Sequence, residues 1–554
     1  MEQNMKKGHP KALYTLFATE MWERFSYYGM RALFTLYLTA ELINGGFGLS
    51  DDDALKLYAV FTGLVYLTPI LGGWVADKFL GKRKTVYIGG LVMAVGQFLL
   101  AASAFLAHSL SPETRLILFN FGLGVLIIGN GFFKPNISTI VGDFYDDNDP
   151  RKDSAFNIFY MGINLGAIMG PFIAGALGEK VAWGWGFLAA GIGMILSVIW
   201  LNAREKTLED KGLPPHTPPG KLVLDAKDWR DIIMYSIALI VGTFVIMTIW
   251  RNLPDSVTKV ITIIGFTAMI LGLSYVIIRG IEEGGAWKKK FYGVVGVVAL
   301  FLIVKYGGIW DSLSEIAQKY TLYAVALLAL LGIIMLLRNE NKDWSRMGVI
   351  ITLAFFNIAF WAGFEQAGGT FNIFAKKFTD RTFFGWEMPA SWFQNINPIA
   401  ILILAPIFSV VWLKLDKMKL NPRTSIKFAL GLFFGALAFF IMTQAQHLID
   451  NGATKVSPMW LFVVYVVLTL GELMLSPIGL SMITKLANPK LVSVVMGLWM
   501  ASFAAGNFMA GMLKSILKTY NFPLYPFIMW VMLGSGLIIV LLSPLLNRAM
   551  KGIH

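Results

Sequence analysis

Two carboxylates and two guanidinium groups lie inside the first long apolar segment of the chain, which runs from about residue 12 to residue 42. A segment of this length can cross a bilayer as a helix. The charged side chains and two tyrosines share one helical arc of roughly 140°; they are Glu20, Glu23, Arg24, Tyr27, Tyr28 and Arg31. An ionised side chain at the bilayer centre costs about 3 kcal/mol or more, so this face cannot point toward lipid. The pattern favours a polar, water-accessible path through a helix bundle. The alternatives are a static ion pair between helices, or charged side chains that snorkel to the membrane surface at the end of the helix.

A lysine lies beside a proline in another apolar segment, at Lys134-Pro135. Proline removes a backbone hydrogen bond at this point. A buried lysine either pairs with an anion or loses its proton. Lys134 is therefore a candidate for binding an anionic group, unless its side chain extends to the cytoplasmic face.

The next apolar segment places Tyr160 and Asn164 one turn apart on one face. Gly162, Gly166 and Gly170 recur every four residues, which permits close packing against another helix. Packing accounts for the glycines. Tyr160 and Asn164 either line a pocket or form hydrogen bonds between helices.

The second half of the chain contains two carboxylates within apolar segments, Glu365 and Glu472, and an amide at Asn397 that opens another segment. Neither carboxylate has a basic residue one turn away, so their partners must come from elsewhere. The first half supplies Arg24, Arg31 and Lys134. A structural salt bridge between the halves is the alternative to a role in binding.

Cations thus concentrate in the first half, whereas carboxylates occur in both. A small zwitterion, with one anionic and one cationic end, would match this arrangement. A carboxylate that loses its cationic partner also gains affinity for protons. The residues therefore suggest proton-coupled movement of a small zwitterion.

The composition indicates an all-α polytopic membrane protein. The 554 residues are 56% hydrophobic with a mean hydropathy of +0.63, and apolar runs recur throughout. The segments of about ten alternating residues that a β-barrel would show are missing. We expect about 14 to 16 transmembrane helices. The predicted parts are a six-helix bundle at 1–203, a cytoplasmic linker at 204–230, inserted helices at 231–343 and a second six-helix bundle at 344–554.

Charge and residue usage exclude several functions. The net charge of +13 comes from basic residues in alternate loops, which places both termini in the cytoplasm and argues against nucleic-acid binding. The chain has no cysteine, and none of its five histidines lies within an apolar span. We therefore expect neither a metal site nor a membrane enzyme, because a nucleophile with its base and an HExxH motif are both missing.

The loop between the second and third apolar segments, residues 72–83, resembles the cytoplasmic loop signature of the major facilitator superfamily. Its sequence is GGWVADKFLGKR. Four further motifs resemble the proton-coupled oligopeptide transporters of that superfamily: Glu20-xx-Glu23-Arg24-Phe-Ser-Tyr-Tyr-Gly, Phe133-Lys134-Pro135-Asn136, Phe159-Tyr160-Met-Gly-Ile-Asn164 and Gly471-Glu472-Leu-xx-Ser476. Together they cover both halves of the chain.

This resemblance implies proton-driven uptake of di- and tripeptides through the plasma membrane by alternating access. Its implied partners are peptides, protons and the lipid bilayer, with no cofactor beyond the proton gradient and a monomer as the functional unit. The resemblance implies substrate binding by Arg24, Tyr28, Arg31, Tyr66, Lys134, Tyr160, Asn164, Asn397, Glu472, Ser476 and Trp499. It implies proton coupling by Glu20, Glu23, Arg24 and Glu365.

Within these roles, Arg24 and Lys134 would meet the peptide carboxylate, and Glu472 with Asn164 and Asn397 would hold its amine. Bacterial members of the family carry two extra helices, which resemble the segments at 231–279. A further insertion at about 282–342 departs from the family pattern. The alternative functions are a related transporter of another small anion such as nitrate, and a peptide sensor that does not transport.

Overall fold

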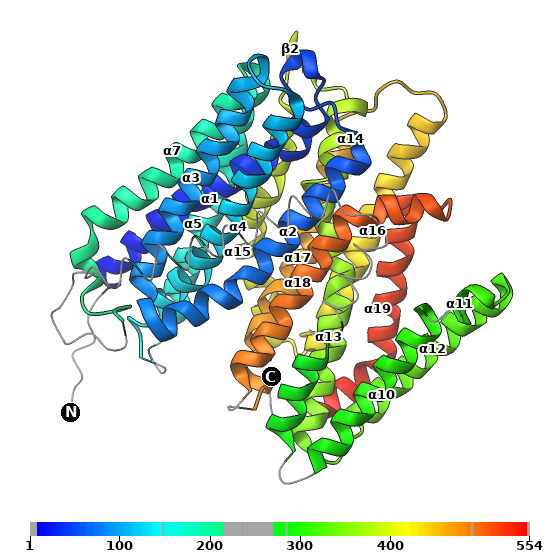
Figure 1. Ribbon diagram of the computed structural model, residues 1–554. Helices are drawn as coiled ribbons and strands as arrows, with labels where there is room; N and C mark the ends of the chain where they lie inside the picture. Colours follow the sequence, from blue (N-terminus) through cyan, green and yellow to red (C-terminus); the bar gives the residue numbers. More distant parts are fainter. Residues whose placement is uncertain are drawn as a thin grey trace.

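The fold is a pair of helical bundles with an inserted arm, as Figure 1 shows for the computed structural model. The structure describes residues 8–146, 151–214, 270–282, 286–306, 309–488 and 491–550, and isolated residues at 149, 230, 234, 237, 241 and 267. The side chains of residues 70, 78, 153, 306, 311, 315, 319, 322, 323, 326, 476–484 and 493 lie outside this description.

The first bundle, which we call the N-half, contains six helical spans. They are α1 (Lys11–Thr39), α2 (Asp51–Val75), α3 (Lys82–Phe105), α4 (Pro112–Gly142), α5 with α6 (Lys152–Gly170 and Ala176–Lys180) and α7 (Trp183–Ala203). Side-chain caps fix two of their starts. Ser50 accepts a hydrogen bond from the backbone N–H of Asp53, and Ser111 accepts one from Thr114.

The second bundle, the C-half, also contains six spans. They are α13 with α14 (Lys342–Phe364 and Thr370–Phe378), the short helix η7 with α15 (Ala390–Asn395 and Ile396–Lys417), α16 (Thr424–Asp450), α17 (Met459–Leu486), α18 (Val492–Thr519) and α19 (Leu524–Ala549). A short β-hairpin precedes η7; its two strands, β1 (Thr382–Phe383) and β2 (Trp386–Glu387), have two residues each.

Ten helices of the described chain are long and apolar enough to cross a membrane. Two more complete the bundles: α1, which carries the buried charges, and α17, which is apolar over Met459–Leu475. The predicted all-α membrane architecture is confirmed. Each bundle has its own apolar core, and the bundles meet where α2 lies against α18, α5 against α15, and α1 against α14.

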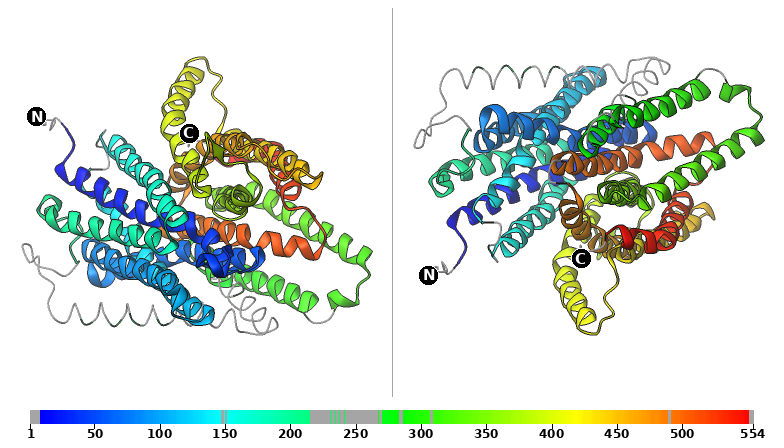
Figure 2. Two further views of the ribbon diagram at one scale, coloured as in Figure 1. Left: turned by 90° about the horizontal axis from the view of Figure 1, so that it is seen from above. Right: turned by 90° about the horizontal axis from the view of Figure 1, so that it is seen from below.

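The inserted arm comprises α10 (Ala286–Tyr306), α11 (Ile309–Ser312) and α12 (Glu315–Leu337). It lies beside the C-half, away from the N-half, and α12 packs against α13 and α19 (Figures 1 and 2). The predicted helices at 231–250 and 258–279 fall largely outside the described residues. The segments at 291–307 and 320–337 are α10 and α12, and neither is among the ten spans.

Candidate functional site

A cavity of about 130 Å³ lies between the two halves, within the bundle. Eight of the residues proposed for binding or proton coupling line it: Tyr28, Arg31, Tyr66, Tyr160, Asn164, Glu365, Asn397 and Glu472. Its wall also contains Gln394, Tyr465, Trp361 and Phe364, which were not among the sequence candidates. Polar groups from both halves thus face one space, with aromatic side chains between them.

The close packing of α5 on α1 holds one wall in place. A Cβ atom on Gly166 would lie 2.1 Å from the carbonyl oxygen of Met21, and one on Gly170 would lie 2.6 Å from that of Phe25. Both distances are shorter than any side-chain contact, so glycine is required here. The predicted packing role of the glycines is confirmed. It brings Tyr160 and Asn164 beside the charged face of α1.

Arg24 lies between two carboxylates of its own helix. Its Nε is 2.7 Å from Oε1 of Glu20 and 3.0 Å from Oε2 of Glu23, and all three side chains are buried. Asn130 of α4 donates a hydrogen bond of 3.2 Å to the other oxygen of Glu23. This cluster lies next to the cavity, but Glu20, Glu23 and Arg24 are not part of its lining.

Lys134 does not line the cavity but contacts a residue that does. Its Nζ is 4.0 Å from the ring centre of Tyr66, which lines the cavity, so the side chain points into the bundle rather than toward the end of α4. An ammonium over an aromatic face is a favourable contact. Among the described residues Lys134 has this contact with an aromatic ring and no ion pair. Lys134 thus lies against one lining residue, Tyr66, and is not itself among the residues that line the cavity.

The two halves share a buried ion pair at the cavity. Nη2 of Arg31 lies 2.7 Å from Oε2 of Glu365. Nε of Arg31 donates a hydrogen bond of 2.9 Å to the hydroxyl of Tyr58, which donates one of 3.2 Å to the same oxygen of Glu365. Glu365 therefore has its cation from the N-half, as the sequence required. Tyr58 completes the triad and had no signal of its own, because it is one tyrosine among the 18 in the chain.

The second carboxylate of the C-half, Glu472, also lines the cavity. Asn397 donates hydrogen bonds of 2.8 Å to Oε2 of Glu472 and 3.0 Å to the hydroxyl of Thr469. Within the described residues Glu472 has no ion pair. Asn164 bonds to the backbone carbonyl of Tyr160 in its own helix, at 3.0 Å, and both residues line the cavity. A carboxylate without a cation thus faces a space that also exposes polar groups of the N-half.

Two candidates are placed differently. Trp499 is only 2% exposed, packs against Phe503 and does not line the cavity. Ser476 belongs to α17, but its side chain is outside the described residues. The structure therefore brings together most of the predicted binding residues, and Arg24, Lys134 and Trp499 are not among those that line the cavity.

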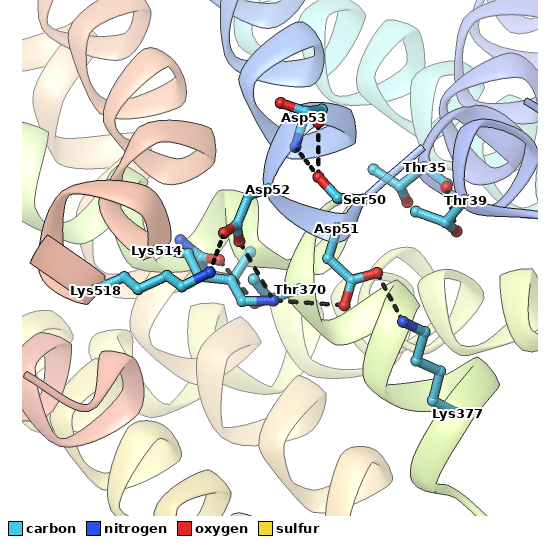
Figure 3. Close-up of polar contacts among 11 residues, drawn as sticks. Thr35, Thr39, Ser50, Asp51, Asp52, Asp53, Thr370, Lys377, Lys514 and Lys518 are labelled. Atoms are coloured by element: carbon cyan, nitrogen blue, oxygen red, sulfur yellow. Dashed lines mark hydrogen bonds and ion pairs between the residues drawn. The ribbon is translucent and has the colours of Figure 1, made fainter. Parts of the chain in front are cut away.

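Ion pairs join the halves where α1 ends and α2 begins, which we call the α1–α2 end. Asp51 lies 2.7 Å from Lys377 and 3.5 Å from Lys514, while Asp52 lies 3.1 Å from Lys518 (Figure 3). One aspartate pair of α2 thus binds to α14 and to α18 at once.

A second set of contacts, between α6 and η7, also closes the α1–α2 end. Glu179 of α6 accepts hydrogen bonds from the backbone N–H groups of Ala390 and Ser391, at 3.0 and 2.9 Å. The ring of Trp392 stacks on that of Phe172, with centres 4.3 Å apart. All described hydrogen bonds and ion pairs between the halves lie either at the α1–α2 end or at the level of the cavity. The structure is therefore closed at the α1–α2 end.

Comparisons with known proteins agree with this geometry. The sequence model of the POT family matches residues 83–217 and 303–528. The uncharacterised transporter YclF of Bacillus subtilis (strain 168) is 33% identical over 551 residues, which cover 99% of this chain and 96% of YclF. The peptide transporter YePEPT of Yersinia enterocolitica is 34% identical over 523 residues, which cover 94% of this chain and 90% of that protein.

Solved structures show the same similarity. A crystal structure of peptide transporter POT in complex with sulfate has a TM-score of 0.70 and 31% identity, and covers 99% of this chain and 98% of that chain. A POT family transporter in complex with 5-aminolevulinic acid has a TM-score of 0.69 and 28% identity, with 98% of each chain covered. The family match resumes at residue 303, so it extends further into the predicted insertion than expected. This chain is a multi-pass membrane transporter that belongs to the POT family, as its motifs predicted.

Proposed function

We propose that this protein carries di- and tripeptides into the cell together with protons, by alternating access of one cavity to the two sides of the plasma membrane. The observation that carries the proposal is the cavity between the halves, with the Arg31–Glu365 pair on one wall and Glu472 on another. Two relatives from Lactococcus lactis, each 32% identical, are named di-/tripeptide transporters.

The charges of the cavity suit a zwitterion better than a simple anion. Glu472 faces the cavity with amide and hydroxyl neighbours, and a peptide ammonium would neutralise it. The peptide carboxylate would then lie toward the N-half, where Arg24, Arg31 and Lys134 supply positive charge. A nitrate ion offers no group for Glu472. The relatives and structural neighbours are transporters, which supports transport rather than enzymatic chemistry.

Proton coupling is proposed to run through carboxylates that change partners. Glu365 is paired with Arg31 while the α1–α2 end is closed. Separation of the halves there would remove the cation, and an unpaired buried carboxylate binds a proton more readily. Glu20 and Glu23 share Arg24, so a substrate carboxylate that engages this guanidinium would favour protonation in the same way. The proton gradient supplies the energy, with no other cofactor and with a monomer as the unit.

We infer the orientation from the basic loops, whose distribution favours a cytoplasmic position for both termini. The α1–α2 end is then the outer end. The contacts of Asp51, Asp52 and Glu179 would therefore close the outer side, in a state prepared to release peptide inward.

The direct test is uptake of labelled dialanine into proteoliposomes, with and without an inward proton gradient. We expect accumulation only with the gradient, and exchange of labelled for unlabelled dialanine without it. Accumulation that does not depend on the gradient would overturn proton coupling. Binding of dialanine without uptake or exchange would instead indicate a peptide sensor.

A further inference from the structure

A cluster of cationic and aromatic side chains lies where the inserted arm meets the C-half. Trp287, at the start of α10, is flanked by two cations: Cζ of Arg279 lies 5.1 Å from the centre of its ring, and Nζ of Lys288 lies 6.0 Å away. Arg279 comes from the preceding apolar helix, Ile270–Ile281. Lys289 follows in the same exposed turn as Lys288. We call Arg279, Trp287, Lys288 and Lys289 the Trp287 cluster.

The charge of this cluster is not balanced within the described residues. Lys290 forms an ion pair with Glu282, and Glu282 also accepts a hydrogen bond from Nε1 of Trp344. In the described part of the chain, Arg279, Lys288 and Lys289 have no such carboxylate, and all three side chains are exposed. Three cations are therefore available to an anion, while the next lysine along is already occupied.

The cluster lies at the level at which α13, part of a candidate membrane span, begins. Trp344, which contacts Lys290 at 4.7 Å, is the third residue of α13 and marks the end of a membrane span. Tryptophan is enriched at this level of a bilayer. From here α10 continues with Val297, Leu300 and Phe301, whose side chains are 70%, 63% and 57% exposed. An anion bound by the cluster would thus have an apolar helix face directly beside it.

We propose that Arg279, Lys288 and Lys289 bind the phosphate of an anionic phospholipid whose acyl chains lie along the exposed apolar face of α10. Basic pockets between transmembrane helices near the cytoplasmic surface favour such headgroups. Trp287 would lie between the phosphate and the acyl chains. The lipid would anchor the base of the arm to the membrane beside α13. This inference depends on the arm lying in the membrane and not on which substrate is transported.

The test uses full-length protein in a neutral detergent, stripped of lipid. Retention of phosphatidylglycerol or phosphatidylcholine is measured by native mass spectrometry over a titration of each lipid. We expect the wild type to bind phosphatidylglycerol in preference, and R279Q/K288Q to bind it about 25-fold more weakly. The estimate uses about 1 kcal/mol per cation at an anionic lipid surface and a factor of ten per 1.4 kcal/mol.

Two variants make the result specific. K290Q changes a lysine of the same run that already has a carboxylate, and should bind phosphatidylglycerol like the wild type. R279K/K288R keeps both charges and should also bind normally, which separates a loss of charge from a loss of folding. Equal binding by wild type and R279Q/K288Q would overturn the proposal, as would a wild type that does not distinguish the two lipids.

Inorganic phosphate provides the remaining comparison. The thermal unfolding temperature of the wild type should rise with phosphatidylglycerol and not with phosphate at the same concentration. An equal rise with phosphate would show that the cluster is a site for free anions, and the lipid assignment would be wrong.

Discussion

Arg31 and Glu365 connect the two halves of the molecule through one buried ion pair, with Nη2 and Oε2 2.7 Å apart. Their side chains are 8% and 5% exposed, and Tyr58 bonds to both. A contact of this kind cannot survive the separation of α1 from α13. The pair therefore belongs to the state that is closed at the α1–α2 end, and its breaking accompanies the opening of that end.

Glu365→Gln should abolish accumulation of peptide against a gradient while some exchange of labelled for unlabelled peptide remains. Removing one partner of a buried pair costs about 3–5 kcal/mol, because the other charge stays buried without compensation. The measurement is dialanine uptake and counterflow in proteoliposomes. Tyr58→Phe is the control: it keeps the ion pair and should lower uptake much less. If Glu365→Gln still accumulates peptide, proton coupling does not require this carboxylate.

Arg24→Lys should strongly reduce uptake. The guanidinium lies within 3.0 Å of Glu20 and Glu23 at once, a geometry that a single ammonium cannot reproduce while also meeting a substrate carboxylate. We expect uptake of dialanine to fall by about tenfold or more, equivalent to about 1.4 kcal/mol. The same exchange at Arg204, an exposed residue after α7, should have no effect. Near-normal uptake by Arg24→Lys would remove Arg24 from the binding role.

Glu472→Gln should reduce the preference of the transporter for peptides with a free amino group. In the wild type, N-acetylated dialanine should compete with labelled dialanine about 10² to 10³-fold more weakly than dialanine itself, since an unpaired buried charge costs about 3–5 kcal/mol. Glu472→Gln should narrow this difference. Thr469→Ala removes a neighbour of Asn397 but keeps the carboxylate, so this variant should preserve the difference between the two peptides. Equal competition by both peptides in the wild type would contradict the assignment.

Asp51→Asn with Asp52→Asn should increase opening at the α1–α2 end. Each exposed ion pair contributes about 0.2–1 kcal/mol and weakens with salt, so the double variant should open a fewfold to about tenfold more often. The chain has no cysteine, so a single cysteine placed at Ala167 in the cavity wall reports access without other thiols. Its alkylation by an impermeant maleimide from outside should be faster in the double variant and, in the wild type, at high salt.

Asp53→Asn is the matched control for that experiment. Asp53 belongs to the same acidic run, but its described partners are Ser50 and Lys56 at the start of α2, so it does not join the halves. Its substitution should leave the alkylation rate unchanged. An equal acceleration by Asp53→Asn would show a general effect of surface charge rather than the loss of a contact between the halves.

Replacement of residues 286–340 by a short polar connector should leave peptide binding intact in protein that still folds. The arm lies beside the C-half, and none of its described residues is among those that line the cavity. It packs on the C-half mainly through α12, which lies against α13 and α19, and not on the helices of the N-half that line the cavity. Binding of labelled dialanine to the purified variant checks the prediction. Loss of binding in a well-folded deletion would show that the arm helps to build the site.

The sequence alone determined the architecture and most of the cavity. In a membrane only helices satisfy every backbone group locally, so long apolar runs reveal each span. Charges within such runs are costly and therefore conspicuous, which identified Arg31, Glu365 and Glu472 before any fold was known. Helical periodicity placed Tyr160 and Asn164 on one face, and both line the cavity.

Only the tertiary structure decided which charges meet. Arg31 and Glu365 are 334 positions apart, and their pairing depends on how two rigid bundles sit against each other. Tyr58 and Thr469 escaped notice because a tyrosine or a threonine costs little in an apolar helix and leaves no local signal. Arg24 and Lys134 are not among the residues that line the cavity. Helical spacing fixes the direction of a side chain around its own axis, whereas the packing of neighbouring helices decides which side chains reach the cavity.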